Sequence, residues 1–340
     1  MRLAFDSRAQ GDPRGIGRYV RCLLDALQAT KPAEATISET HRPRRCDVFH
    51  SPWLEGAQLR TPCPSVVTLH DLVALKRRSE YLRTGVRFGL RYLAAQHAEQ
   101  IIVPSQVVAA DAQELLSIDP TRITVIPEAA DPVMRRRSGA EIARARKRYQ
   151  LPEHYLLWVG SMQHPDPRKR VAALAQAPRT MPLVLAGPAR EWAYELPDVT
   201  LTGAVSDDDL AAIYSGAHAL VFPSDDEGFG LPTVEALACG TPVVACDTPV
   251  VREVLGDRAR FVPRGDMEGL LAAGVEARRP APAPPVWSWD DAARATWAVY
   301  DAACENARSG VGIDVRRRAA RQAAMLPRTL LGPRARREAS

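Results

Sequence analysis

The sequence predicts an α/β protein built from two doubly wound domains, each with a mostly parallel sheet between helices. Short apolar runs typical of buried strands alternate along the chain with amphipathic stretches of helical period. This alternation stops once, at residues 127–150, and then starts again. Because 340 residues are enough for two domains of ordinary size, we interpret the interruption as the boundary between them.

The first series of predicted elements ends near residue 126. We expect strands at 3–5, 47–49, 65–69, 101–103 and 123–126, and helices over 16–29, 83–97 and 105–116. Strands that alternate with helices in this way are typical of a parallel sheet with helices on both faces. The stretch that follows holds Pro127, Pro132 and three consecutive arginines, which favours a linker and then an entry helix.

The second series starts again with an apolar run. We expect strands at 155–159, 183–186, 199–201, 219–222, 242–245 and 260–262. Ser206 followed by three aspartates predicts the start of a helix over 206–215, and a final helix over 289–307 places Trp297 and Tyr300 on its apolar side. The predicted organisation is therefore a first domain at 1–130, a linker and entry helix at 131–150, a second domain at 151–280, a C-terminal helix at 281–307 and a tail at 308–340.

The positive charge of the chain lies in this tail. Residues 308–340 contain nine arginines and two acidic residues, a net charge of +7 against +5 for the whole chain. We expect such a segment to be solvated and disordered. The alternative is that it is attracted to anionic lipid head groups, at about 1 kcal/mol per basic residue near the surface.

Several classes of protein lack their sequence signals here. No apolar stretch reaches the roughly 18–20 residues that span a bilayer, and the N-terminus has no signal-peptide pattern, so we expect a cytoplasmic protein. The six cysteines show no metal-binding spacing, which favours reduced thiols and no metal site. A phosphate-binding P-loop, a nucleophile elbow and an RNA-binding aromatic motif are also missing, and no nucleic-acid partner is expected.

The most informative motif is Glu227-Gly-Phe-Gly-Leu-Pro-Thr-Val-Glu235, directly after a predicted strand. Glycines let the backbone approach a ligand closely, and Pro232 suits the first turn of a helix. The start of such a helix offers free N–H donors for sugar hydroxyls or phosphate oxygens. A glycine-bearing turn with two solvated acids is an equally good interpretation of the motif by itself.

Two glutamates eight residues apart in this phrase resemble the hallmark of the GT-B glycosyltransferases of family 4. Further stretches are similar to that family in the same order along the chain. They are Trp158-Val-Gly-Ser161 with Pro167-Arg-Lys169, Asp207 to Tyr214, Glu235 to Val244, and Ser288 to Ala293. The resemblance covers residues 1 to about 306, and it implies two Rossmann-like domains facing each other across a cleft.

The resemblance also implies roles for residues of the second domain. Glu227 would contact the donor sugar, with help from the backbone of the adjoining loop, Gly228, Phe229, Gly230 and Leu231. Glu235 would bind the ribose hydroxyls, and the base would pack near Gly187 and Val205. Arg168 and Lys169 would hold the diphosphate. Fixed cations suit that task, because a departing nucleoside diphosphate gains negative charge as the glycosidic bond breaks. Ordinary surface charge remains the alternative for both.

In the first domain, the family's glycine loop is similar to Gly15-Ile-Gly17, which would abut the diphosphate. A plain strand–helix turn is the commoner explanation for such glycines. His70 follows the predicted strand 65–69, at the end where parallel sheets place ligands. By resemblance it would line the site beside the donor sugar, and the alternative is a histidine that merely ends a strand.

The implied activity is retaining, metal-independent transfer of a hexose from a nucleotide-diphosphate sugar, with no further cofactor. The Pro-Arg-Lys phrase favours GDP-mannose over a UDP-sugar. The acceptor would be a glycan or a lipid-linked molecule in the synthesis of a surface polysaccharide or glycolipid, at the inner face of the plasma membrane. Only residues 30–46 separate the first helix from the next predicted strand, which leaves the acceptor domain short. The alternatives are a nucleotide-sugar epimerase of the same architecture and a degenerate binding protein that attaches to membranes.

Overall fold

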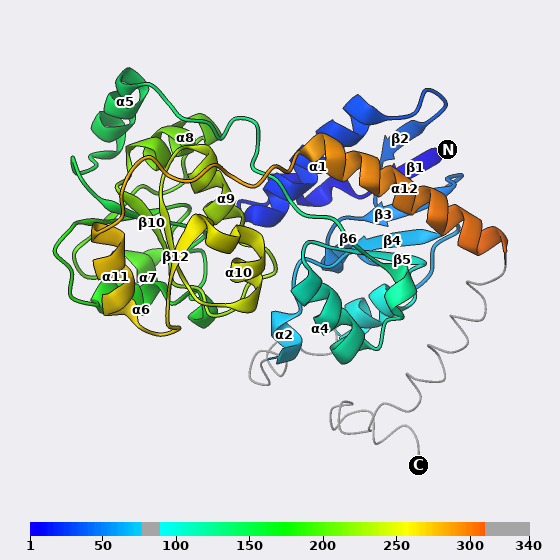
Figure 1. Ribbon diagram of the computed structural model, residues 1–340. Helices are drawn as coiled ribbons and strands as arrows, with labels where there is room; N and C mark the ends of the chain where they lie inside the picture. Colours follow the sequence, from blue (N-terminus) through cyan, green and yellow to red (C-terminus); the bar gives the residue numbers. More distant parts are fainter. Residues whose placement is uncertain (77–88, 310–340) are drawn as a thin grey trace, which may run out of the picture.

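The computed structural model describes residues 1–76 and 89–309, which form two α/β domains side by side (Figure 1). The first domain contains a six-stranded parallel sheet in the order β2-β1-β3-β4-β5-β6. Its strands are β1 (Arg2–Phe5), β2 (Thr36–Glu39), β3 (Val48–Ser51), β4 (Ser65–Thr68), β5 (Gln100–Val103) and β6 (Ile123–Val125). This order turns back between β1 and β3, as in flavodoxin-like sheets.

The second domain contains another six-stranded parallel sheet, in the order β12-β11-β10-β7-β8-β9. Its strands are β7 (Leu156–Val159), β8 (Leu183–Ala186), β9 (Val199–Leu201), β10 (Ala219–Phe222), β11 (Val243–Cys246) and β12 (Ala259–Val262). Counted within the domain, this is the Rossmann order, with the turning point between β7 and β10. In both sheets the turning point opens a crevice at the carboxyl ends of the strands, where ligands bind.

Helices cover the faces of both sheets. The first domain has α1 (Gly15–Thr30), α2 (Val73–Lys76) and α4 (Gln106–Leu116), with residues 89–96 also helical. The second has α5 (Gly139–Tyr149), α6 (Val171–Gln176), α7 (Glu191–Tyr194), α8 (Asp207–Gly216), α9 (Leu231–Ala238), α10 (Pro249–Leu255) and α11 (Met267–Val275). Capping explains several starts: the side chains of Ser105, Ser138 and Ser206 each accept a hydrogen bond from a first-turn N–H.

The last helix, α12 (Trp289–Arg308), returns from the second domain and packs on the first, beside α1 (Figure 1). Trp297 and Tyr300 lie in the same buried cluster as Leu3 and Phe5 of β1, as their predicted apolar side requires. The Tyr300 hydroxyl also lies 2.7 Å from Nδ1 of the buried His50 on β3. The first domain is therefore completed by the end of the chain.

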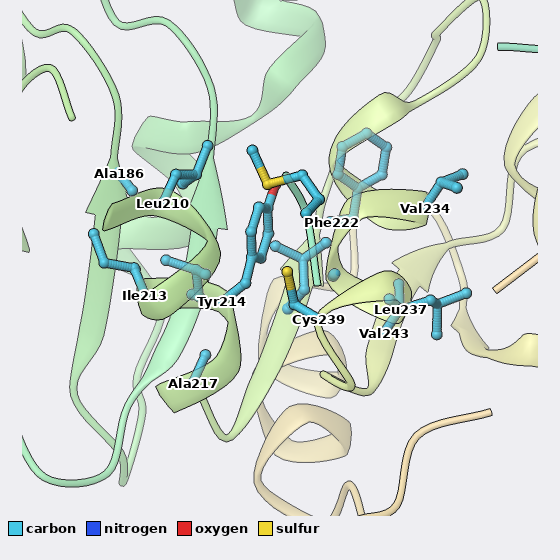
Figure 2. Packing of buried hydrophobic residues seen from close by; sticks show 14 of the residues in the cluster. Ala186, Leu210, Ile213, Tyr214, Ala217, Phe222, Val234, Leu237, Cys239 and Val243 are labelled. Carbon is cyan, nitrogen blue, oxygen red and sulfur yellow. The ribbon is translucent and has the colours of Figure 1, made fainter. Parts of the chain in front are cut away.

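A separate apolar core fixes the helices that carry the second-domain side of the cleft. Figure 2 shows Ile213 and Tyr214 of α8 packed with Val234 and Leu237 of α9 and with Phe222 of β10. These side chains are at most 3% exposed. Close packing of this kind holds the start of α9 and the end of β10 in fixed positions.

The structure confirms the predicted α/β class and the two doubly wound domains. It adds β2 within residues 30–46, which the sequence analysis left without a strand, because β2 is short and exposed and pairs only with β1. Part of the predicted helix 83–97 and the tail from residue 310 lie outside the described residues, so the tail's attraction to lipid stays a prediction. Across the described ranges, none of the helices is long and apolar enough to cross a membrane.

Replacing Trp297 with alanine should destabilise the first domain, although the residue is remote from it in sequence. The side chain is 5% exposed, and large-to-small changes at buried tryptophans cost about 3–5 kcal/mol. Urea unfolding measures the loss. Tyr194→Ala is the control, because Tyr194 is 66% exposed. A Trp297→Ala protein as stable as this control would contradict the placement of α12.

Candidate active site

A cavity of about 490 Å³ lies between the two domains, at the carboxyl ends of both sheets. The first domain lines it with the start of α1 and with His70, Asp71 and Glu128. The second lines it with the ends of β7 and β8, the loop after β10 and the start of α9. The two sheet crevices therefore face each other and form one site. Its lining includes every residue predicted for the site except Gly17.

Gly15 and Gly17 differ in what surrounds them. Helix α1 starts at Gly15, which lines the cavity close to Leu231 of the other domain. Gly17 lies two positions further into the helix, and a Cβ there would be 2.0 Å from the carbonyl oxygen of Asp12. The absence of a side chain at 17 thus serves packing within the first domain. Gly17 does not line the cavity, and the donor-binding role predicted for it stays a prediction.

His70 is held by two hydrogen bonds from its own domain. Nε2 lies 2.9 Å from the carbonyl oxygen of Pro52, and Nδ1 lies 3.0 Å from the carboxylate of Glu128. The carbonyl can only accept, so Nε2 carries a proton, and the carboxylate favours a proton on Nδ1 as well. Burial lowers the pKa of His70, but the hydrogen bond and charge of Glu128 more than offset this, and the pKa is raised. Both ring nitrogens of His70 are thus engaged within the first domain, which leaves neither of them placed to accept a proton from a ligand.

The loop after β10 approaches His70 from the second domain. A Cβ on Gly228 would lie 1.6 Å from the His70 carbonyl oxygen, so any other residue would force the domains apart. Gly230 caps α9 with a φ of 93°, a left-handed conformation that favours glycine. The N–H groups of Gly228, Phe229 and Gly230 donate to no acceptor among the described residues. They are thus free to bind oxygens of a ligand in the cavity.

Arg168, Lys169 and Glu227 line the cavity on the side of the second domain. Arg168 bonds Asp166 at 2.8 Å and reaches across the cleft to Asp71 at 3.1 Å. Burial lowers the pKa of Arg168, but the negative charges of Asp71 and Glu227 raise it by more than that. The net pKa is raised, so the guanidinium is firmly charged. Within residues 1–76 and 89–309, Lys169 and Glu227 have no ion-pair partner. Two cations therefore share the cavity with Glu227: Arg168, fixed by two aspartates, and Lys169.

Glu235 lies on α9 and is 1% exposed. The Tyr214 hydroxyl donates to its Oε2 at 3.0 Å, and the guanidinium of Arg18 bonds its Oε1 from the first domain. Burial raises the pKa of Glu235, and the charge of Arg18 opposes that increase. The same guanidinium bonds Asp207 at the start of α8. Gly187 and Val205, the predicted neighbours of the base, also line the cavity.

Sequence reasoning missed Arg18, Asp71, Glu128 and Tyr214 as site residues. Asp71 and Glu128 follow the carboxyl ends of β4 and β6, and Arg18 lies in the first turn of α1, but many charged residues occupy such positions. Tyr214 lies near the end of α8 and carries no such signal. Among the described residues, no group of three or more His, Cys, Asp and Glu side chains is arranged to hold a metal ion.

Two Rossmann-like domains whose sheet ends face a shared cleft define the GT-B class of glycosyltransferases. Solved structures support that fold. Sucrose-phosphate synthase from Thermosynechococcus elongatus superposes with a TM-score of 0.62 at 20% identity, covering 96% of this chain and 100% of that one. HepE from Anabaena, solved with UDP-glucose, superposes with a TM-score of 0.61 at 17% identity, covering 96% and 99%.

Sequence comparison then gives the family. Residues 7–133 match the model of Glycosyltransferase Family 4, and residues 153–277 match that of Glycosyl transferases group 1. The chain belongs to this family, whose enzymes are retaining and metal-independent. It is 29% identical over 230 residues to O-antigen chain mannosyltransferase B of Escherichia coli, an alignment that covers 61% of this chain and 59% of that protein's length.

The pairing of His70 with Glu128 predicts a pH dependence. We expect the His70 ring to titrate above the ordinary histidine pKa of about 6.5, and to titrate lower in Glu128→Gln, which keeps an acceptor but removes the charge. NMR spectra of the histidine rings across pH measure both values. His218, whose Nε2 bonds the Val275 carbonyl at 2.9 Å, is the internal control.

The raised pKa of His70 also determines how the free energy of unfolding changes with pH. Because the folded pKa is raised, the stabilisation by His70 is fully present below the unfolded pKa and is lost as pH rises through the folded pKa. Glu128→Gln should therefore narrow the difference in unfolding free energy between mildly acidic and alkaline pH. Equal His70 pKa values in the two proteins would contradict the pairing.

Proposed function

We propose that this chain transfers a hexose from a nucleotide-diphosphate sugar to an acceptor, with retention and without a metal ion. One observation carries the proposal. Arg168, Lys169, the free N–H groups of residues 228–230 and the start of α9 all border one cavity between the domains. That set of donors and positive charges matches a diphosphate, and no part of it needs a metal to complete it.

The reacting bond would lie beside the diphosphate. As the bond between the sugar and the phosphate breaks, negative charge grows on the leaving group, and Arg168 and Lys169 stabilise it. Asp166 and Asp71 fix the Arg168 guanidinium, which limits its reorganisation during the reaction. Glu227 would hold hydroxyls of the donor sugar, together with the backbone N–H groups of the loop.

The nucleoside would occupy the other end of the cavity. Glu235 would accept hydrogen bonds from the ribose hydroxyls, and Gly187 and Val205 would border the base. His70, with both ring nitrogens bound within its own domain, would line the site at the donor sugar in a fixed orientation. The acceptor would enter between the start of α1 and the donor sugar.

Mannose is the sugar we propose, from GDP-mannose. The mannosyltransferase from Escherichia coli supports this choice, while HepE, solved with UDP-glucose, is similar only in fold. The Pro167-Arg168-Lys169 phrase points the same way. A growing surface glycan or a lipid-linked sugar is the proposed acceptor, since the relative from Escherichia coli is described as acting on an O-antigen chain.

A thermal-shift screen should identify the donor. GDP and GDP-mannose should raise the melting temperature more than UDP, ADP or their sugars, because a ligand that binds only the folded protein stabilises it by mass action. Incubation with the best donor and no acceptor should then give at most slow hydrolysis, with or without a chelator. A change in the sugar itself would identify an epimerase, and strong inhibition by the chelator would contradict the metal-free cation clamp.

Lys169→Ala should lower transfer by more than about tenfold, because it removes a charge that stabilises the departing diphosphate. Initial rates with the donor from the screen measure the effect. Arg170→Ala is the matched control, since Arg170 is the adjacent cation but pairs with Asp225 at 2.6 Å and does not line the cavity. Equal rates in the Lys169→Ala and wild-type proteins would exclude Lys169 from the site.

A further inference from the structure

Arg18 joins the two domains at the nucleoside end of the cavity. It lies on α1 of the first domain, yet its guanidinium bonds Glu235 of α9 and Asp207 of α8, both in the second domain. The side chains of Arg18 and Glu235 are 14% and 1% exposed. The contact is therefore largely shielded from water, where an ion pair is stronger than at the surface and where an unpaired charge is costly.

The two carboxylate oxygens of Glu235 have hydrogen-bond partners from different domains. The Tyr214 hydroxyl donates to Oε2, and it is held in place by the core around α8 and α9 (Figure 2). Oε1 receives its hydrogen bond from Arg18, across the cleft. If the first domain moved away, a buried carboxylate would keep one neutral donor and lose its counter-charge.

In the proposed function, Glu235 accepts hydrogen bonds from the ribose hydroxyls, and an ionised carboxylate serves this task best. An ionised carboxylate accepts about four hydrogen bonds, so Tyr214 and Arg18 leave capacity on each oxygen for a sugar hydroxyl. Burial without a counter-charge favours the protonated form, which donates from one oxygen and accepts less. The charged groups around Glu235 are Arg18 of α1 and Asp207 of α8, and of these only Arg18 favours the carboxylate.

We propose that Arg18 is a positioning residue for ribose recognition, which acts through Glu235 and completes the nucleoside site from the opposite domain. The guanidinium keeps Glu235 ionised and oriented, so the site accepts ribose hydroxyls fully only when the domains are closed. This inference rests on the proposed function, in which Glu235 binds the ribose. It goes beyond that function by making a first-domain residue part of nucleoside recognition.

Arg21 provides a matched control. It lies one turn further along α1 and bonds Asp207 at 3.4 Å, so it is a second cation from the first domain at the same end of the cavity. Its side chain is 41% exposed, and it makes no contact with Glu235 among the described residues. Removing Arg21 changes the charge between the domains and leaves the partners of Glu235 in place.

The test combines two pairs of ligands with wild type and three variants. Calorimetry measures the binding of GDP and of 2′,3′-dideoxy-GDP, and of the corresponding UDP pair, to wild type, Arg18→Met, Arg18→Lys and Arg21→Met. We expect wild type to prefer the ribose form by at least about tenfold, because a site built for hydroxyls rejects a ligand that lacks them. Arg18→Met should reduce this ratio to near one, Arg18→Lys should restore part of it, and Arg21→Met should keep it.

The ratio separates the possible failures. If Arg18→Met keeps the wild-type ratio of the two affinities, even while it binds both ligands more weakly, that result would show that Arg18 only holds the domains together. The inference would then be wrong, while the ribose role of Glu235 stands. A wild-type ratio near one, or no binding of either nucleotide, would instead overturn the proposed role of Glu235. Binding of the dideoxy ligand by Arg18→Met also shows that the variant is folded.

Discussion

Opposite charges that meet across a gap between two separately folded domains create the site in this protein. Arg18 reaches from the first domain to Glu235, and Arg168 reaches from the second domain to Asp71. The pair of Arg18 and Glu235 is shielded from water, and the pair of Arg168 and Asp71 is partly shielded, so each charge depends on its partner more than in a surface ion pair. The charge state of the site residues in each domain is therefore set partly by the other domain.

Close backbone contact between the two domains also shapes the cavity, at the loop after β10. The absence of a side chain at Gly228 lets the loop after β10 rest on the His70 carbonyl, and the Ser105 hydroxyl donates to the Gly228 carbonyl at 2.9 Å. The carboxylate of Glu253 on α10 accepts from the N–H groups that start α4. These contacts fix how near the two sheets come, and thereby bring the N–H groups of the loop and the edge of His70 to one cavity.

Local pattern was enough to predict most of the fold. Apolar runs for buried strands gave both sheets, and capping residues such as Ser206 gave helix starts, because burial and hydrogen bonding act over a few neighbouring residues. The strand β2 was missed, since an exposed edge strand carries no apolar signal. The return of α12 to the first domain was missed too, because an apolar face such as that of Trp297 and Tyr300 does not state which domain it will cover.

For the site, the sequence by itself determined the chemistry available: the glycines of the loop, Glu227 and Glu235, the adjacent cations Arg168 and Lys169, and a histidine at a strand end. Only the tertiary structure decided the pairings, such as Arg18 with Glu235 and His70 with Glu128. The reason is physical. A residue's type fixes which charge or hydrogen bond it can offer, but its partner and its exposure to water depend on chain segments more than fifty residues away, which meet only when the domains pack.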